Sequence, residues 1–445
     1  MNLVFAAIAD DDTGASDIAG MLAAEGMRTI IVLDSASPGE LSQWAEAADA
    51  IVIATATRAL RPDEAYSRTR QAVELLRPLT PHMICVKYCS TFDSTERGNI
   101  GPSIDAAMDA LGESFTVAVP ALPVNGRTTF MGYHFVGRQL LSDSPMRHHP
   151  LNPMTNPNLV SHLQSQTRRR VGLIAYPAVH LGVSAIAQEI DLVRKAGGEI
   201  AIVDCTCDAD LAAICEAIAE FPLITGSSGP AMMLPLHWKR LGYWSEARDE
   251  CGMLARFKTE HGILAVSGSC SEATRMQCRR ADDAGIYSIQ LNGIEIVAGR
   301  IDPVPVVREA VERINAGQNV LISTTAEIAH VRKVHEWALA HGLDAVEAGL
   351  RISRMLGALA KEIFNLATPQ GLILAGGETS STICRILGVR ALAVGQNIAP
   401  GVPLCVTIAV PQIPLLLKSG NFGGEDFFSR AVDAINALPV REPRG

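Results

Sequence analysis

The chain has 445 residues, of which 48% are hydrophobic and 19% charged, and its formal net charge is −9. This length exceeds one ordinary hydrophobic core, so two domains are expected, and the acidic balance argues against a nucleic-acid partner, whose phosphates attract basic surfaces. No apolar run reaches the length of about 18 residues that spans a bilayer, and the start MNLVFAAIADDD lacks the features of a signal peptide, so we expect a cytoplasmic location and no membrane partner.

Short apolar segments alternate with amphipathic ones along the first half of the chain. We expect strands at 3–9, 29–34, 50–55, 82–88, 115–121, 171–178 and 199–205, and helices at 15–26, 62–77, 100–111 and 183–197. The strands are apolar throughout instead of alternating between apolar and polar residues. This pattern is typical of a parallel sheet that is covered on both faces.

Residues 122–157 interrupt this alternation and are rich in Pro, Asn, Gly and His. We expect them to form a long irregular loop that acts as a functional loop or a lid. His148 and His149 lie in this segment, without an acidic or histidine partner at the spacing of metal ligands. A role in the loop or in substrate contact is therefore favoured over metal binding.

A second α/β series follows residues 236–258, which are interpreted as a connector. Its expected strands lie in ILAVS, NVLIST, GLILAG and VPLCVTI, between residues 263 and 408. The predicted fold is therefore α/β, with an N-terminal domain at 1–235 and a C-terminal domain at 259–445. Each domain is expected to hold a largely parallel sheet flanked by helices, with the active site in the interdomain cleft.

Polar side chains follow several predicted strands, at the edge where an open parallel sheet binds ligands. The first strand ends in Asp10, Asp11 and Asp12, the third leads to Arg58, and the fourth ends near Lys87 and a run of hydroxyl side chains. Adjacent carboxylates repel one another, so their placement indicates a function. Such a set suits a small hydroxylated acid: cations hold its carboxylate, and an aspartate takes the proton of a hydroxyl.

A purely structural role is the alternative for each of these charges. One aspartate can serve as a helix N-cap, and Thr13 competes for that position. Three carboxylates exceed what a cap needs, because a cap uses one oxygen. Arg58 on its own would more often belong to a surface ion pair, whereas Lys87 directly follows apolar residues and is harder to explain in that way.

The C-terminal half contains three turns rich in glycine and serine, in VSGSCSEAT (266–274), AGGETSSTICRILG (375–388) and LKSGNFGGEDFF (417–428). Small residues let backbone N–H groups approach phosphate oxygens, and a helix N-terminus favours negative charge. One such turn is common in any α/β fold, but three in one domain predict a nucleotide site.

Neither GxxxxGK[ST] nor a GxGxxG after a strand occurs. The residues alone thus predict a two-domain α/β enzyme that binds an acid in one half and a phosphate in the other, which favours phosphoryl transfer. An NAD-dependent hydroxy-acid dehydrogenase is a distant alternative that the missing GxGxxG disfavours. A ligand-binding regulator without catalysis is a further alternative, although an acidic triplet is poorly suited to hold an acid.

The opening IADDDTGASD resembles the signature of the four-carbon acid sugar kinases, and the resemblance continues through most of the chain. It includes the segments KYCSTFDSTERGNIGP, PALPVNGRTTFMGYHFV, MRHHPLNPMT, LITGSSGPAM, SGSCSEAT, AGGETSS, APGVPL and LKSGNFGGEDFF. Within this family the chain is most similar to the 3-oxo-tetronate 4-kinases, through KYCSTFDST and RHHPLNPMT. D-Threonate and D-erythronate 4-kinases are the close relatives that remain as alternatives.

The resemblance implies ATP-dependent phosphorylation of the terminal 4-hydroxyl of a four-carbon sugar acid, with Mg²⁺ bound at ligands that the sequence does not identify. It implies that the N-terminal domain binds the sugar acid through Asp10, Asp11, Arg58, Lys87, Tyr88, Cys89, Ser90 and Thr91. It implies that the C-terminal domain binds ATP through residues among Ser267, Ser269, Gly376, Gly377, Glu378, Thr379, Ser380, Gly401, Gly420 and Gly423.

Asp11 is the expected base, with Asp10 as the alternative. The family usually has an apolar or aromatic residue where this chain has Asp12, which leaves open which of the three carboxylates does the chemistry. The stereochemistry of the substrate and assembly into a homo-oligomer are also left open.

Overall fold

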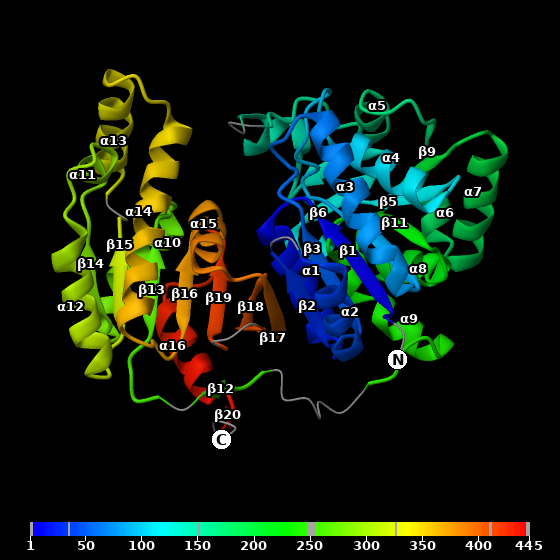
Figure 1. The fold of residues 1–445 in the computed structure, drawn as a ribbon. Helices are drawn as coiled ribbons and strands as arrows, with labels where there is room; N and C mark the ends of the chain where they lie inside the picture. The colour runs from blue at the N-terminus through cyan, green and yellow to red at the C-terminus, as the bar shows by residue number, and fades with distance from the viewer. Residues whose placement is uncertain are drawn as a thin grey trace. The chain divides into compact units, whose positions relative to one another are not determined.

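A computed structural model describes residues 3–33, 36–148, 152–246, 254–257, 259–324, 327–408 and 412–441. The chain divides into two compact units. Unit 1 comprises Met1–Val32 with Ala36–Arg248, and unit 2 comprises Leu33–Ser35 with Asp249–Gly445. Each unit has strands and flanking helices of its own (Figure 1), and apolar side chains are buried in each.

The sheet of unit 1 is parallel throughout. In spatial order its strands are β2 (Thr29–Val32), β3 (Ala50–Ala54), β1 (Phe5–Ala9), β4 (Met83–Lys87), β11 (Leu223–Gly226), β5 (Thr116–Val119), β10 (Ile200–Val203) and β9 (Val171–Ile174). Every residue of β1 and β4 is buried, as the continuous apolar pattern predicts. The sequence-based expectation did not include β11, which lies between β4 and β5.

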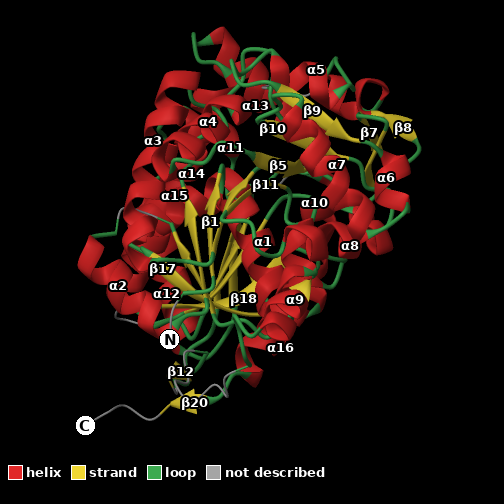
Figure 2. Cartoon of the chain, turned by 90° about the vertical axis from the view of Figure 1, so that its right-hand side faces the viewer, coloured by secondary structure: helices red, strands yellow, loops and turns green. Residues whose placement is uncertain are grey.

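Helices cover both faces of this sheet. They are α1 (Asp12–Ala24), α2 (Pro38–Ala47), α3 (Pro62–Leu76), α4 (Ile100–Leu111), α5 (Leu159–Gln164), α6 (Tyr176–His180), α7 (Val183–Lys195), α8 (Asp208–Ile218) and α9 (Leu234–Leu241). The crossover from β1 to β2 and the crossover from β3 to β4 run in opposite directions along the sheet. Right-handed connections therefore place α1 and α3 on opposite faces, and Figure 2 shows α3 and α4 on one side of β1, with α1 and α8 on the other.

The expectation of an irregular segment at 122–157 was wrong in part. Residues from this stretch form an antiparallel sheet of β6 (Arg127–Phe130), β7 (Tyr133–Val136) and β8 (Gln139–Leu140). The turn between β6 and β7 has positive φ at both Met131 (51°) and Gly132 (77°), which suits a tight hairpin but which the dipeptide Met-Gly does not announce. His148 is exposed in a 3₁₀ turn, and His149 lies outside the described residues.

The sheet of unit 2 is largely parallel, as predicted. Its order is β14 (Tyr287–Gln290), β15 (Val320–Ser323), β13 (Leu264–Ser267), β16 (Leu372–Ala375), β19 (Pro414–Lys418), β18 (Val402–Thr407) and β17 (Ala391–Ala399). The pairs β19–β18 and β18–β17 are antiparallel, and the other pairs are parallel. The carboxyl ends of β13, β16 and β19 therefore lie next to one another.

The helices of unit 2 are α10 (Glu272–Asp283), α11 (Gly293–Val297), α12 (Pro303–Asn315), α13 (Ile328–Ala340), α14 (Ala345–Leu366), α15 (Gly377–Leu387) and α16 (Phe427–Ala437). The short strands β12 (Arg256–Phe257) and β20 (Val440–Arg441) pair with each other. The expected connector at 236–258 begins inside α9, where Trp238 is fully buried against Phe5 of unit 1. Among the described helices, none is long and apolar enough to cross a membrane.

Candidate functional site

The three aspartates lie where β1 ends and α1 begins. Asp11 is the N-cap of α1: its Oδ1 accepts a hydrogen bond from the N–H of Gly14 at 2.6 Å, and its Oδ2 accepts one from the Thr13 hydroxyl at 2.7 Å. Thr13 thus assists the cap and does not form it. Asp10 precedes the cap at the carboxyl edge of the sheet, and Asp12 lies in the first turn of the helix.

Arg58 joins the first two carboxylates. Its Nε and Nη2 each donate to Asp10 at 2.8 Å, and its Nη1 lies 2.7 Å from Oδ2 of Asp11. The arginine side chain is 23% exposed, compared with 15% for Asp10 and 26% for Asp11. An ion pair of this bidentate form, largely removed from water, fixes the carboxylates more firmly than a surface pair would.

The loop that carries Arg58 is held by Asn99, which the sequence did not single out. The Nδ2 of this buried asparagine donates to the carbonyls of Thr57 (2.5 Å), Arg58 (3.0 Å) and Leu60 (3.2 Å). Ala56, in the same loop, has a φ of 52°, which is uncommon for a residue other than glycine. Such backbone strain persists only where surrounding contacts over-determine it, and it is frequent at binding sites.

Lys87 is the last residue of β4 and is only 2% exposed. Its ammonium donates to the carbonyl of Tyr88 at 3.0 Å and acts electrostatically on both carboxylates. The chain passes so close to this cluster at Gly14 that a β-carbon there would lie 2.6 Å from Oδ1 of Asp11 and 3.2 Å from Nζ of Lys87. Glycine at position 14 is therefore part of the site.

The pKa values of the two carboxylates diverge. Burial raises the pKa of Asp10, and Asp11 adds to this increase, although Arg58 and Lys87 oppose it. Burial acts on Asp11 as well, but Arg58, Lys87, Thr13 and the N–H of Gly14 outweigh it and hold its pKa below the usual value. On acidification Asp10 therefore takes up a proton before Asp11 does, and Asp11 stays ionised at neutral pH.

The predicted substrate segment after Lys87 is only partly directed to this edge. The Tyr88 ring is buried, with its hydroxyl 3.2 Å from that of Thr225 in the core, and the Thr91 hydroxyl donates to Asp93. Cys89 and Ser90 are partly exposed, and burial raises the pKa of the Cys89 thiol to about 11, so the thiol is uncharged. The buried His134 holds the backbone here through a 2.8 Å hydrogen bond from Nε2 to the carbonyl of Ser90.

The end of β11 adds two residues that the sequence-based reasoning did not assign to the site. Ser228 is fully buried and donates to the carboxylate of Asp17 on α1, and Ser227 donates to the carbonyl of Ala121 at 2.7 Å. Their signal in the sequence is the run TGSSG, a cluster of small polar residues directly after an apolar strand. This run is related to the acid site by its position, because β11 pairs with β4, the strand that ends in Lys87.

In unit 2 the three predicted turns meet at the ends of β13, β16 and β19. The N–H of Gly376 donates to the carbonyl of Lys418 at 2.8 Å, and the N–H of Gly268 donates to that of Ala375 at 3.2 Å. A β-carbon on Gly420 would lie 2.7 Å from Oγ of Ser269, and one on Gly376 would lie 3.3 Å from the β-carbon of the same serine. Glycine is what allows these turns to pack so closely.

A cavity of about 300 Å³ opens beside two of these turns. Its polar wall contains Ser269, Gly376, Gly377, Glu378 and Thr379 of the predicted set. Helices α11, α13 and α14 supply the remainder, including His330, Val334, His335 and Ile352, which the sequence did not suggest. A site with one apolar wall and one wall of backbone turns can hold a base and its phosphates.

The other predicted nucleotide residues are placed differently. Ser267 and Ser380 are buried, and Gly401 forms the turn between β17 and β18, with a φ of 72°. Gly423 lies against Phe427, beyond the turn at Gly420. Burial raises the pKa of Glu378, and the charge of Arg385 opposes this increase. A carboxylate at this position fits contact with hydroxyls or a cation better than contact with phosphate.

Among the described residues, no group of three or more His, Cys, Asp or Glu side chains could hold a metal ion. Mg²⁺ commonly binds through substrate phosphates together with one or two carboxylates, and that arrangement does not require such a group.

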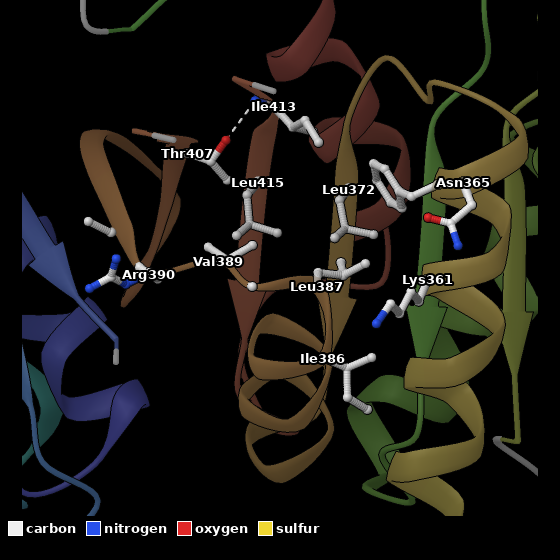
Figure 3. A pocket seen from close by; sticks show the side chains of 13 residues that line it. Lys361, Asn365, Leu372, Ile386, Leu387, Val389, Arg390, Thr407, Ile413 and Leu415 are labelled. Atoms are coloured by element: carbon white, nitrogen blue, oxygen red, sulfur yellow. Dashed lines mark hydrogen bonds between the residues drawn. The ribbon is translucent and has the colours of Figure 1, made fainter. Parts of the chain in front are cut away.

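A second cavity, of about 240 Å³, lies over β16 and β19 of unit 2 (Figure 3). Apolar side chains such as Leu372, Leu387 and Leu415 line most of it, and the side chains of Lys361 and Arg390 lie at its two ends. It contains none of the predicted site residues. We therefore place no part of the candidate site there.

Two family models match this chain. A family model described as a sugar-binding N-terminal domain matches residues 5–234, and one described as a nucleotide-binding C-terminal domain matches residues 264–428. A 3-oxo-tetronate kinase of Cupriavidus necator is 40% identical over 96% of this chain and 95% of its own. One of Burkholderia multivorans is 41% identical over 96% of both chains.

Two crystal structures have the same fold. A protein from Salmonella typhimurium LT2 is 33% identical, with a TM-score of 0.83 over 96% of this chain and 98% of its own. A protein from Haemophilus influenzae is 34% identical, with a TM-score of 0.78 over 97% of this chain and all of its own. Together, the matched domains and full-length relatives confirm the family that the sequence motifs indicated: the chain belongs to the four-carbon acid sugar kinases, the family of the 3-oxo-tetronate kinases.

Proposed function

We propose that the protein transfers the γ-phosphoryl group of ATP to the terminal 4-hydroxyl of 3-oxo-tetronate, giving 3-oxo-tetronate 4-phosphate and ADP. The observation that carries the proposal is the pair of carboxylates that one arginine holds at the carboxyl edge of the unit 1 sheet. The full-length similarity to 3-oxo-tetronate kinases supports this substrate over D-threonate or D-erythronate.

Asp11 is the proposed base in this reaction. It is the more exposed of the two carboxylates, and its lowered pKa keeps it ionised at neutral pH. Its carboxylate accepts the proton of the 4-hydroxyl. The hydroxyl oxygen meanwhile forms a bond to the γ-phosphorus, and the bond between that phosphorus and the β–γ bridging oxygen breaks. Because such transition states are loose, the carboxylate acts as much by orienting the hydroxyl as by its basicity.

In this proposal Arg58 and Lys87 mainly hold the two carboxylates, whereas the sequence suggested that they bind the acid group of the substrate. The three donor nitrogens of Arg58 already face Asp10 and Asp11, so the arginine positions the base, and the acid group of the substrate can only share it. Lys87 compensates the second negative charge. Two carboxylates and two cations leave the cluster neutral, so Ser90, which is partly exposed, is proposed to bind the acid group.

The nucleotide is proposed to occupy the cavity of unit 2. Its phosphates would lie beside Ser269 and face the N–H of Gly377, where the N-terminus of α15 favours negative charge. Glu378 would contact the ribose hydroxyls or the cation. Mg²⁺, when bound to the phosphates, would neutralise part of their charge. The reaction needs ATP, which is consistent with the expected cytoplasmic location.

The test is the release of ADP from Mg-ATP in the presence of 3-oxo-tetronates, D- and L-threonate, and D- and L-erythronate, with product mass as a second readout. We expect turnover on 3-oxo-tetronate. Asp11→Asn should lower kcat about 100-fold or more. The matched control is Asp12→Asn, which removes the same charge one residue later and should retain most of the activity.

Turnover on a threonate or erythronate alone would contradict the substrate and leave the reaction intact. ATP binding without turnover on any acid in the panel would contradict the proposed acceptor. Equal losses in the two asparagine variants would contradict the assignment of Asp11 as the base.

A further inference from the structure

A buried ammonium lies beside the proposed nucleotide site and has no role in the reaction described above. Lys418 is the last residue of β19, and its side chain is completely buried. Its own carbonyl accepts the N–H of Gly376, so its backbone belongs to the junction of the three turns. Among the described residues it forms no ion pair.

The ammonium is used entirely in local hydrogen bonds. Its Nζ donates to the carbonyls of Ser419 (3.0 Å) and Gly420 (2.9 Å) and to the hydroxyl of Thr274 (2.8 Å), and it lies 5.6 Å from the centroid of the Phe427 ring. Burial lowers the pKa of Lys418 to about 8. A buried charge without a carboxylate costs free energy, and an apolar residue of the same length would avoid that cost.

The polar face of α10 converges on the same turn. The carbonyl of Gly420 accepts hydrogen bonds from the hydroxyls of Ser271 and Thr274 as well as from Lys418. Gln277, one helical turn further along, donates through Nε2 to the carbonyls of Phe422, Gly423 and Gly424 at 2.9–3.0 Å. Five carbonyls between residues 419 and 424 therefore accept bonds from Lys418 and from α10.

These five carbonyls point toward Lys418 and α10, and their direction fixes the direction of the N–H groups. In a planar trans peptide the N–H points opposite to the carbonyl of the same peptide unit. The N–H groups of Gly420, Asn421, Gly423, Gly424 and Glu425 therefore point away from the donors that hold the carbonyls. Successive N–H groups that share one side of a turn form a concave site for an anion.

We propose that Lys418 is the positioning residue of the nucleotide site: its ammonium draws in the carbonyls of the 419–424 turn so that the N–H groups of the turn are presented to the phosphates of ATP. The inference rests on the proposed function, because it assumes that ATP binds in unit 2. Lys418 acts through the turn and does not itself contact the nucleotide, since its side chain has no exposed surface.

The test is titration calorimetry of ATP with the full-length wild type, Lys418→Met and Lys361→Met. Methionine keeps the length and the apolar stem of Lys418 and removes its donors and its charge. We expect the dissociation constant for ATP to rise about tenfold, the equivalent of one or two lost hydrogen bonds. Lys361 lies on the same unit at an exposed position, and its variant should bind ATP as the wild type does.

Thermal unfolding separates positioning from simple structural support. Because methionine removes an uncompensated buried charge, Lys418→Met should keep or raise the melting temperature while ATP binding weakens. With ATP bound, amide hydrogen exchange should also be faster at 420–425 in this variant than in the wild type, and it should be the same in β13 and β16. A lysine with only a structural role would give a lower melting temperature and an unchanged dissociation constant.

The failures are distinguishable. If the wild type does not bind ATP, the proposed function fails. If the wild type binds and folded Lys418→Met binds within twofold of it, the inference about Lys418 fails. Should the methionine variant not fold, Thr274→Val removes one partner of both Lys418 and Gly420 and keeps the shape of the side chain. Unchanged ATP affinity in that variant would overturn the inference in the same way.

Discussion

The proposed acid site of unit 1 and the proposed nucleotide site of unit 2 both have a lysine at the end of a buried strand. Lys87 ends β4 and Lys418 ends β19, and each ammonium folds back onto the carbonyl of the following residue at 3.0 Å. Their surroundings differ. Lys87 acts on two carboxylates that also bind Arg58, whereas Lys418 meets only carbonyls and a hydroxyl in its hydrogen bonds.

This difference separates two ways of building a site. In the proposed site of unit 1 the functional atoms belong to side chains, and opposite charges hold one another in place. In the proposed site of unit 2 the functional atoms are backbone N–H groups, and the proposed role of the buried cation is to shape the backbone that carries them. The first kind of site should depend on charge at each position, and the second on glycine and on the contacts that hold the turn.

The largest effect is expected from Arg58→Met, which removes the cation that Asp10 and Asp11 share. Two neighbouring carboxylates would lose most of their compensation, and leaving buried charges uncompensated typically costs about 3–5 kcal/mol. We expect turnover below detection and a lower free energy of unfolding by denaturant. Arg61→Met, which removes an arginine that is 72% exposed, is the control and should change neither. Activity near wild type in Arg58→Met would contradict a charge-built site.

A smaller loss is expected from Gly14→Ala. The new β-carbon would lie 2.6 Å from the Asp11 carboxylate and must displace it, at a cost of about 1–3 kcal/mol. We expect kcat/KM for the sugar acid to fall, with the affinity for ATP unchanged. In the control Gly39→Ala, on α2, the added carbon meets nothing within 4 Å. If the two variants behave alike, the close approach at Gly14 has no role.

The corresponding test in unit 2 is Gly376→Ala. This glycine is the N-cap of α15 with a φ of 122°, a conformation that alanine rarely adopts. We expect the dissociation constant for ATP to rise several-fold in titration calorimetry. Gly388→Ala, at the other end of the same helix with a φ of 72°, should cost about 1 kcal/mol of stability and leave ATP affinity intact. Equal effects on ATP would contradict a site built from the backbone turns.

The smallest effect is expected from pH. Because burial lowers the pKa of Lys418 from 10.5 to about 8, raising the pH through 8 removes the charge from the folded protein while the unfolded chain keeps its proton. ATP affinity should therefore fall above pH 8. Over the same window, up to about 10.5, this lysine's contribution to the free energy of unfolding should rise, since the unfolded state binds more protons. Titrations at several pH values should show this alkaline loss in the wild type and not in Lys418→Met.

The sequence predicts much of the fold because buried parallel strands appear as uninterrupted apolar runs. The strands near Ile8, Ile51 and Ile373 were predicted within one or two residues of their bounds in this way. The short strand β11 was not predicted, because four residues, LITG, carry too little pattern. The hairpin of β6 and β7 was missed because its Met-Gly turn lacks the usual sequence signal.

The residues of the candidate site likewise differ in whether the sequence predicts them. Asp10, Asp11, Arg58 and Lys87 could be predicted because charges that follow apolar strands stand out, and the structure brings them together. Asn99 could not be predicted as the support of Arg58, since 41 residues separate them along the chain. Lys418 carried the same signal as Lys87, a lysine directly after apolar residues, and the sequence-based reasoning overlooked it.

The assignment of one ligand to each unit is tested most directly by titration calorimetry. ATP and 3-oxo-tetronate are each titrated into Asp11→Asn and into Lys418→Met. We expect the first variant to lose affinity for the sugar acid and to bind ATP as the wild type does. We expect the reverse for the second variant. Loss of ATP affinity in Asp11→Asn, or loss of sugar-acid affinity in Lys418→Met, would contradict the assignment of one ligand to each unit.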